Sequence, residues 1–195
     1  MKKVMVILSP GFEEGETVEI IDILRRAEFL CESVSIAGKE VSGTHGITVL
    51  ADKVLGENLE DYLQYDMIVL PGGWRGTDHM LADERVLKLV RYYDEHDRFV
   101  AAMCAAPNVL AKAGITKGRT VTSYPGPKCE PNFQDANYVQ DVVAFDGKMI
   151  TSRGPATALP FAFALVDALE GDSGFIKKRL LYNQMKAYPD GVKEG

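Results

Sequence analysis

The chain has 195 residues, of which 46% are hydrophobic and 26% are charged. This composition is typical of a water-soluble globular protein with one sizeable core, so we expect a single domain over residues 1–195, with its core at about 3–170 and a C-terminal helix and tail at 171–195. The net charge of -6 and the pI near 5.1 argue against nucleic acid as a partner, because phosphate binding requires a basic face.

Neither a signal peptide nor a membrane span is expected. The first apolar run, residues 4–8, ends at Ser9-Pro10-Gly11, whereas a secretory core needs about 7–15 apolar residues and a membrane helix about 20. The three cysteines have no Cys-x-x-Cys spacing, which fits neither a disulfide framework nor a metal site. The sequence therefore predicts a protein of a reducing, cytoplasmic compartment, with no membrane partner and no bound metal.

Strands and helices are expected to alternate along the first half of the chain. Residues 4–8 predict a buried strand, and Thr17, Ile20, Ile21, Leu24 and Ala27 recur at helical spacing in the segment that follows. We expect another strand at 33–37, a small hairpin or meander within the glycine-containing segment 38–57, and a strand at 66–70 that runs into Pro71-Gly72-Gly73.

The second half of the chain continues this alternation. The expected order is a charged helix at 84–96, a strand at 99–103, a helix at 105–112 closed by Gly114, strands at 119–123, 139–144 and 148–152, and an apolar helix at 157–169. Asp146-Gly147 predicts a hairpin turn between the last two strands. The pattern indicates an α/β fold with a mainly parallel sheet, which binds ligands at the carboxyl ends of its strands.

Cys104 stands at one such strand end, between the apolar run 99–103 and the predicted helix. A thiol placed at a helix N-terminus faces unpaired N–H groups and the positive end of the helix dipole, so we expect its pKa to fall below the free value of about 8.5. This is the arrangement of a nucleophile elbow with cysteine in place of serine. The alternative is a small buried residue that fills space at the end of a strand.

Four motifs occur in an order and spacing that resemble the ThiJ/PfpI superfamily. They are Gly11-Phe12-Glu13-Glu14-Gly15-Glu16-Thr17, Val69-Leu70-Pro71-Gly72-Gly73, Ala101-Ala102-Met103-Cys104-Ala105-Ala106-Pro107 and Thr151-Ser152-Arg153-Gly154-Pro155. The resemblance is closest to the branch that holds the Parkinsonism-associated deglycase and its bacterial YajL-like relatives, and it extends from Lys3 to about Leu169. It implies a flavodoxin-like three-layer sandwich that forms a homodimer.

The resemblance assigns the reactive cysteine to Cys104 and an acidic partner to Glu16. A carboxyl group that shares a buried site with a thiolate is disfavoured as an anion, so we expect Glu16 to stay protonated and to donate a hydrogen bond to the sulfur. The alternative for Glu16 is a solvent-facing carboxylate that complements a helix N-terminus. Glu13 and Glu14 fit that alternative better.

Backbone groups are expected to complete the site. Gly72 and Gly73 allow a ligand to approach the main chain closely, and the N–H groups of Gly73 and Ala105 could form an oxyanion hole. A Pro-Gly-Gly sequence is otherwise a common turn. Arg153 resembles a family arginine at the mouth of the pocket, where it either binds an anion or ties loops together, and we favour the second role.

Histidine is missing from two positions where related proteins use it. Tyr124 stands where animal relatives carry a histidine, and a phenol with a pKa of about 10 donates a hydrogen bond but does not act as a base near neutrality. Ala105 follows the cysteine, whereas PfpI-type peptidases and class I glutamine amidotransferases rely on a histidine partner. We expect the chain's three histidines, His45, His79 and His96, to be surface residues. The sequence therefore does not predict a Cys-His protease.

The other cysteines and the single tryptophan lie outside these motifs. We expect Cys31 to be a buried apolar residue and Cys129, beside Lys128, to be partly reactive. Trp74 directly follows the glycines, where it would shape either the pocket entrance or the dimer surface. Gly72-Gly73-Trp74-Arg75-Gly76 has neither glycine fingerprint of a nucleotide-binding loop.

Two hypotheses of different class follow. The first is an enzyme of glyoxalase III or deglycase type that acts in stress protection, in which Cys104 and Glu16 process a small aldehyde or a glycated substrate without a cofactor. The second is a redox-sensing or chaperone-like protein whose Cys104 is oxidised to a sulfinate without turnover. Both hypotheses include a homodimer built from the first helix and an adjoining loop.

Overall fold

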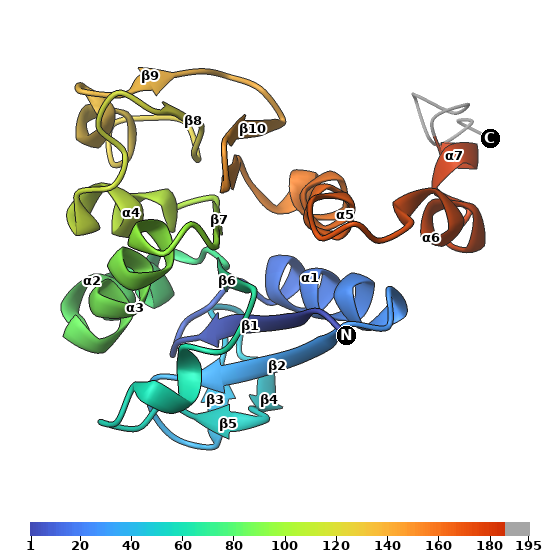
Figure 1. Ribbon diagram of the computed structural model, residues 1–195, viewed down its shortest axis with the longest axis horizontal. Coiled ribbons are helices and arrows are strands. Elements are labelled where there is room, and N and C mark those ends of the chain that lie inside the picture. The colour runs from blue at the N-terminus through green and yellow to red at the C-terminus, as the bar shows by residue number, and fades with distance from the viewer. Residues whose placement is uncertain (186–195) are drawn as a thin grey trace.

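A seven-stranded sheet forms the centre of the computed structural model, which describes residues 1–185 (Figure 1). The strand order is β10-β11-β7-β6-β1-β2-β5, and all neighbours are parallel except β10 and β11. These strands are β1 (Lys3–Leu8), β2 (Leu30–Ser35), β5 (Lys53–Val54), β6 (Met67–Leu70), β7 (Phe99–Met103), β10 (Val143–Asp146) and β11 (Met149–Ser152).

Helices cover both faces of this sheet. Helices α1 and α5 lie side by side against one face, while α2, α3 and α4 pack on the other (Figure 1). The helices are α1 (Glu14–Arg26), α2 (Trp74–Ala82), α3 (Glu84–Glu95), α4 (Pro107–Ala113), α5 (Ala158–Ala168), α6 (Ser173–Arg179) and α7 (Tyr182–Met185). The expected single-domain, flavodoxin-like α/β sandwich with a mainly parallel sheet is confirmed.

Strand β1 shows why the apolar runs become central strands. Val4 and Val6 pack with the core on the α1 and α5 side, whereas Met5 and Ile7 pack with the core on the opposite side. Successive side chains of a strand point to opposite faces, so a strand covered by helices on both sides must be apolar at every position. The run 4–8 meets this requirement and is fully buried.

The helix ends follow local sequence signals. Glu13 caps α1, and its side chain accepts the N–H of Glu16 at 2.6 Å. Helix α4 has Pro107 at its start and ends at Gly114, whose φ of +84° suits glycine. The bounds of α4 agree with the expected helix at 105–112 to within two residues.

Three segments differ from the expectations. Of the strand expected at 139–144, only the last two residues are in a strand, as the start of β10. Within 119–123 only β8 (Thr120–Val121) is a strand, and it pairs with β9 (Asn137–Tyr138) in a small sheet of its own. Another two-stranded sheet is formed by β3 (Glu40–Ser42) and β4 (Thr48–Leu50). Helix α2 was not expected, because the glycines before Trp74 indicate a turn rather than a helix start. Short helical turns lie at 60–62, 130–133 and 155–157. Over residues 1–185, every helix is too short or too polar to cross a membrane.

Candidate active site at Cys104

Cys104 lies on a sharp turn between β7 and α4. Its φ is +59°, in the left-handed region that non-glycine residues rarely adopt, and such strain persists only where the surroundings hold the backbone in place. The Cys104 N–H donates to the Ser152 carbonyl at 3.1 Å, and its own carbonyl accepts the Tyr124 N–H at 2.8 Å. Neighbouring segments on both sides therefore fix the elbow, and the side chain is 7% exposed.

Glu16 reaches this elbow from the first turn of α1. It is completely buried, and its Oε2 accepts the Gly72 N–H at 2.8 Å, while Oε1 has no hydrogen-bond partner within the described chain. Burial raises the pKa of Glu16 to about 7, although hydrogen bonding to Cys104 and Gly72 acts in the opposite direction. A buried carboxylate oxygen without a partner is costly, which favours the protonated acid.

Glu16 and Cys104 titrate as a pair. Burial and the negative charge of an ionised Glu16 raise the pKa of Cys104, whereas the amides of Gly73 and Ala105 lower it. The expectation that this pKa falls below its free value is therefore wrong, because burial and the charge of Glu16 outweigh the two amides. Glu16 ionises first and the second proton is hard to remove, so the pair holds one proton over a wide pH range above about 7.

Gly72 and Gly73 are both required by close packing around the pair. A Cβ atom on Gly72 would lie 2.5 Å from the Cys104 Cβ and 2.7 Å from the Glu16 Oε2. A Cβ atom on Gly73, whose φ is +93°, would lie 2.5 Å from the Gly11 carbonyl oxygen. The Gly72 amide is occupied by Glu16, which leaves the amides of Gly73 and Ala105 to act on the sulfur.

The sequence matches the DJ-1/PfpI family over residues 2–168. The chain belongs to this family. It is 39% identical to Protein dj-1beta of Drosophila melanogaster, over 87% of this chain and 90% of that one, and 36% identical to the Parkinson disease protein 7 homolog of Danio rerio, over the same shares. The crystal structure of Drosophila DJ-1beta matches with a TM-score of 0.85, covering 92% of this chain and 97% of that chain at 36% identity. Oxidized Toxoplasma gondii DJ-1 matches with a TM-score of 0.85 at 29% identity, over 93% and 98% of the two chains.

In this DJ-1/PfpI protein, Tyr124 and Arg153 lie near the elbow and differ in their exposure to solvent. The Tyr124 ring is 40% exposed and contacts Trp74 edge-on, with the ring centroids 5.8 Å apart. Arg153 is half-buried, and its Nη1 donates to the Thr122 hydroxyl at 3.4 Å. The arginine thus links the loop after β11 to the segment after β8.

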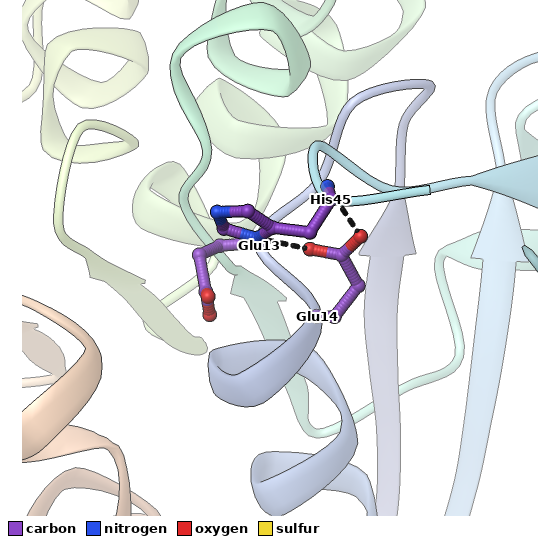
Figure 2. A group of neighbouring side chains, drawn as sticks. All are labelled: Glu13, Glu14 and His45. Atoms are coloured by element: carbon purple, nitrogen blue, oxygen red, sulfur yellow. Dashed lines mark hydrogen bonds and ion pairs between the residues drawn. The ribbon is translucent and has the colours of Figure 1, made fainter. Parts of the chain in front are cut away.

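Glu14 is buried, which corrects the expectation that it faces solvent. It is 5% exposed, and its Oε1 accepts the backbone N–H groups of His45 at 2.6 Å and Ile47 at 3.3 Å. Figure 2 shows the His45 ring against the other oxygen, with Nδ1 3.0 Å from Oε2. This carboxylate ties the β3–β4 loop to the start of α1, while the His45 side chain itself is exposed, as expected.

Glu13, Glu14 and His45 form the only group of metal-ligand side chains found within residues 1–185, with ligand atoms within 4.8 Å of one another (Figure 2). Both oxygens of Glu14 already accept hydrogen bonds, and the Glu13 Oε2 accepts the Glu16 N–H. The Glu13 carboxylate also points away from that of Glu14 (Figure 2). Hydrogen bonding within the protein accounts for this cluster.

The remaining cysteines lie away from the pair. Cys31 is buried as expected, and burial raises the pKa of its thiol to about 12. Cys129 is fully buried, and burial raises its pKa too, so the expectation of a partly reactive thiol beside Lys128 is wrong. Its sulfur faces the Asn108 side chain, which donates to it at 3.4 Å. The three thiols therefore have different surroundings, and Cys104 is the one that shares a hydrogen bond with a buried carboxyl group, that of Glu16.

Proposed function

We propose that this protein processes small reactive carbonyls, such as methylglyoxal and glyoxal, through Cys104 and without a cofactor, as glyoxalase III or deglycase-type members of its family do. The observation that carries the proposal is the buried Glu16, whose pKa is raised to about 7, beside a strained Cys104. An acid with a pKa near neutrality can both give and take a proton at physiological pH.

In the first step, the ionised Glu16 carboxylate takes the proton of the Cys104 thiol as the sulfur attacks the aldehyde carbon. A carbon–sulfur bond forms, the carbonyl π electrons move to oxygen, and Glu16 passes its proton to that oxygen, which completes the hemithioacetal and leaves Glu16 ionised again. The amides of Gly73 and Ala105, which already face the sulfur, stabilise the oxyanion. In this proposal the Tyr124 hydroxyl, from the segment whose N–H contacts the Cys104 carbonyl, donates to the second carbonyl of the substrate.

In the second step, Glu16 moves protons between substrate atoms. Its carboxylate removes the proton from the carbon bonded to sulfur and returns it to the adjacent carbonyl carbon, while the hydroxyl proton of the hemithioacetal passes to the oxygen on that adjacent carbon, which yields a hydroxyacyl thioester. Water then cleaves the carbon–sulfur bond and regenerates the thiol. Methylglyoxal plus one water gives lactate, and glyoxal plus one water gives glycolate, so no external oxidant or reductant is consumed.

The test is a lactate assay with methylglyoxal and no glutathione. We expect turnover by the wild type and by Cys129→Ser, and no turnover by Cys104→Ser. Loss of activity in both variants would point to unfolding, which circular dichroism would reveal. The proposal is wrong if the folded wild type consumes its thiol stoichiometrically and releases no lactate.

That last result would favour the second candidate, a protective protein regulated by oxidation of Cys104. Its specific support is the position of the other thiols, because Cys31 and Cys129 are buried and form no disulfide. A sulfenate at Cys104 would then have no resolving cysteine and would proceed to the sulfinate. A fall in thermal stability or in holdase activity after stoichiometric oxidation would support this function.

We also propose that the protein is a homodimer. Val18 on α1, Ile47 and Leu50 are 50%, 57% and 68% exposed, and the side chains of Val18 and Leu50 border a shared hollow between α1 and β4. Apolar residues on one face suit a two-fold, self-complementary interface. Light scattering at micromolar concentration should report a dimer for the wild type and a monomer for Val18→Asp. A monomeric wild type would refute the proposal.

A further inference from the structure

A cavity lies on the α2 and α4 side of the sheet. It has a volume of about 570 Å³, and one face of each helix together with the 128–132 segment forms its walls. Thr77 and Leu81 of α2 and Asn108 and Ala111 of α4 contribute to the lining. A cavity of this size accommodates a small organic molecule. Cys104 and Glu16 are not among its lining residues.

The cavity carries charges that the protein does not neutralise. Lys112, Lys128 and Asp78 line it, and none of them forms an ion pair with another of residues 1–185. Two cations and one anion give a local positive excess in a chain whose net charge is -6. The electrostatics therefore favour a ligand with an anionic group that also offers a hydrogen-bond donor to Asp78.

Polar groups in the lining point to the same kind of ligand. The Asn132 side chain lines the cavity, and its Nδ2 donates a hydrogen bond to Asn108 Oδ1 at 3.0 Å, which holds both amides in place. Thr77 is 1% exposed, and its hydroxyl has no hydrogen-bond partner in the part of the chain that is described. A buried hydroxyl without a partner is unfavourable, so a polar ligand atom at this wall would stabilise it.

Trp74 supplies an aromatic surface at the edge of the cavity. It is 37% exposed, and the Lys128 ammonium lies 4.9 Å from the centroid of its ring. A planar group against the indole would therefore have a cation beside it. We propose that this cavity binds a planar organic anion, with its anionic group at Lys112 and Lys128, its donors at Asp78 and its planar part against Trp74.

Nucleoside monophosphates and aromatic amino acids share this chemistry, and a fluorescence titration separates them. Trp74 is the only tryptophan of the chain, so its emission reports on the cavity directly. We expect saturable changes with AMP or with L-phenylalanine, and changes at least about tenfold weaker with adenosine or benzene, which lack the charge. Saturation by AMP alone assigns a phosphate ligand, and saturation by phenylalanine alone assigns a carboxylate ligand.

Charge-matched variants complete the test. Lys112→Met and Lys128→Met should each weaken binding about tenfold or more, whereas Lys88→Met, on the exposed face of α3, should leave it unchanged. Calorimetry provides a second readout, since Lys128→Met also alters the surroundings of Trp74. Cys104→Ser should bind as the wild type does. The proposal is overturned if no probe saturates at millimolar concentration, if adenosine binds as tightly as AMP, or if all three lysine variants behave alike.

Discussion

The buried carboxyl group of Glu16 should make the folded protein less stable as the pH rises. Its pKa is about 7 in the folded protein, against an ordinary value of 4.5, because burial penalises the charged form. Between these two values the folded protein keeps a proton that the unfolded chain has released. The free energy of unfolding therefore falls with increasing pH across this window and levels off above it.

The shift corresponds to about 3 kcal/mol, because each pKa unit is worth about 1.4 kcal/mol. Glu16→Gln removes the charge and keeps an oxygen that can accept the Gly72 N–H. We therefore expect this variant to be more stable than the wild type by about 3 kcal/mol at pH 8, but by only about 0.5 kcal/mol at pH 4.5.

Urea unfolding at the two pH values measures this difference directly. Glu95→Gln, a change of the same type at an exposed position on α3, controls for the general effect of losing one negative charge. A stability gain for Glu16→Gln that is equal at both pH values, or no gain at pH 8, would show that the folded protein does not hold this carboxyl in its protonated form.

Three further predictions concern neighbouring groups. Gly72→Ala should lower lactate formation at least about a hundredfold in the steady-state assay, because the added methyl group displaces the thiol and the acid; an active variant would contradict the proposed geometry. Glu14→Gln should destabilise the protein by about 1–3 kcal/mol in urea unfolding. Burial opposes the charge of Glu14, but hydrogen bonds from His45 and Ile47 lower its pKa below 4.5. The carboxylate therefore stabilises the fold above that pH, and the stability lost in Glu14→Gln should become smaller in acid. An equal loss of stability at pH 3 and pH 7 would argue against this. Treatment with increasing amounts of peroxide should convert Cys104 to the sulfinate before it modifies Cys31 or Cys129, as measured by peptide mass spectrometry. Earlier modification of Cys31 or Cys129 would show that Cys104 is not the most reactive thiol.

The sequence alone was sufficient for the strands at the centre of the sheet and for the elbow. The apolar runs 4–8 and 99–103 predict buried strands because a strand covered on both faces has no polar position, and these strands occur where expected. Gly114 ends the helix after Cys104 because glycine adopts a positive φ without strain. Both signals depend on residues that are adjacent in the chain, so each could be recognised without knowledge of the neighbours.

The surroundings of ionisable side chains were decided by tertiary structure. Glu14 looked like a surface carboxylate, yet His45 and Ile47, more than thirty residues away, donate hydrogen bonds to it and bury it. The direction of the Cys104 pKa likewise depends on how closely Glu16 approaches the sulfur and how deeply both are buried. Solvation and through-space charge set these properties, and they act between residues that only the packed fold brings together.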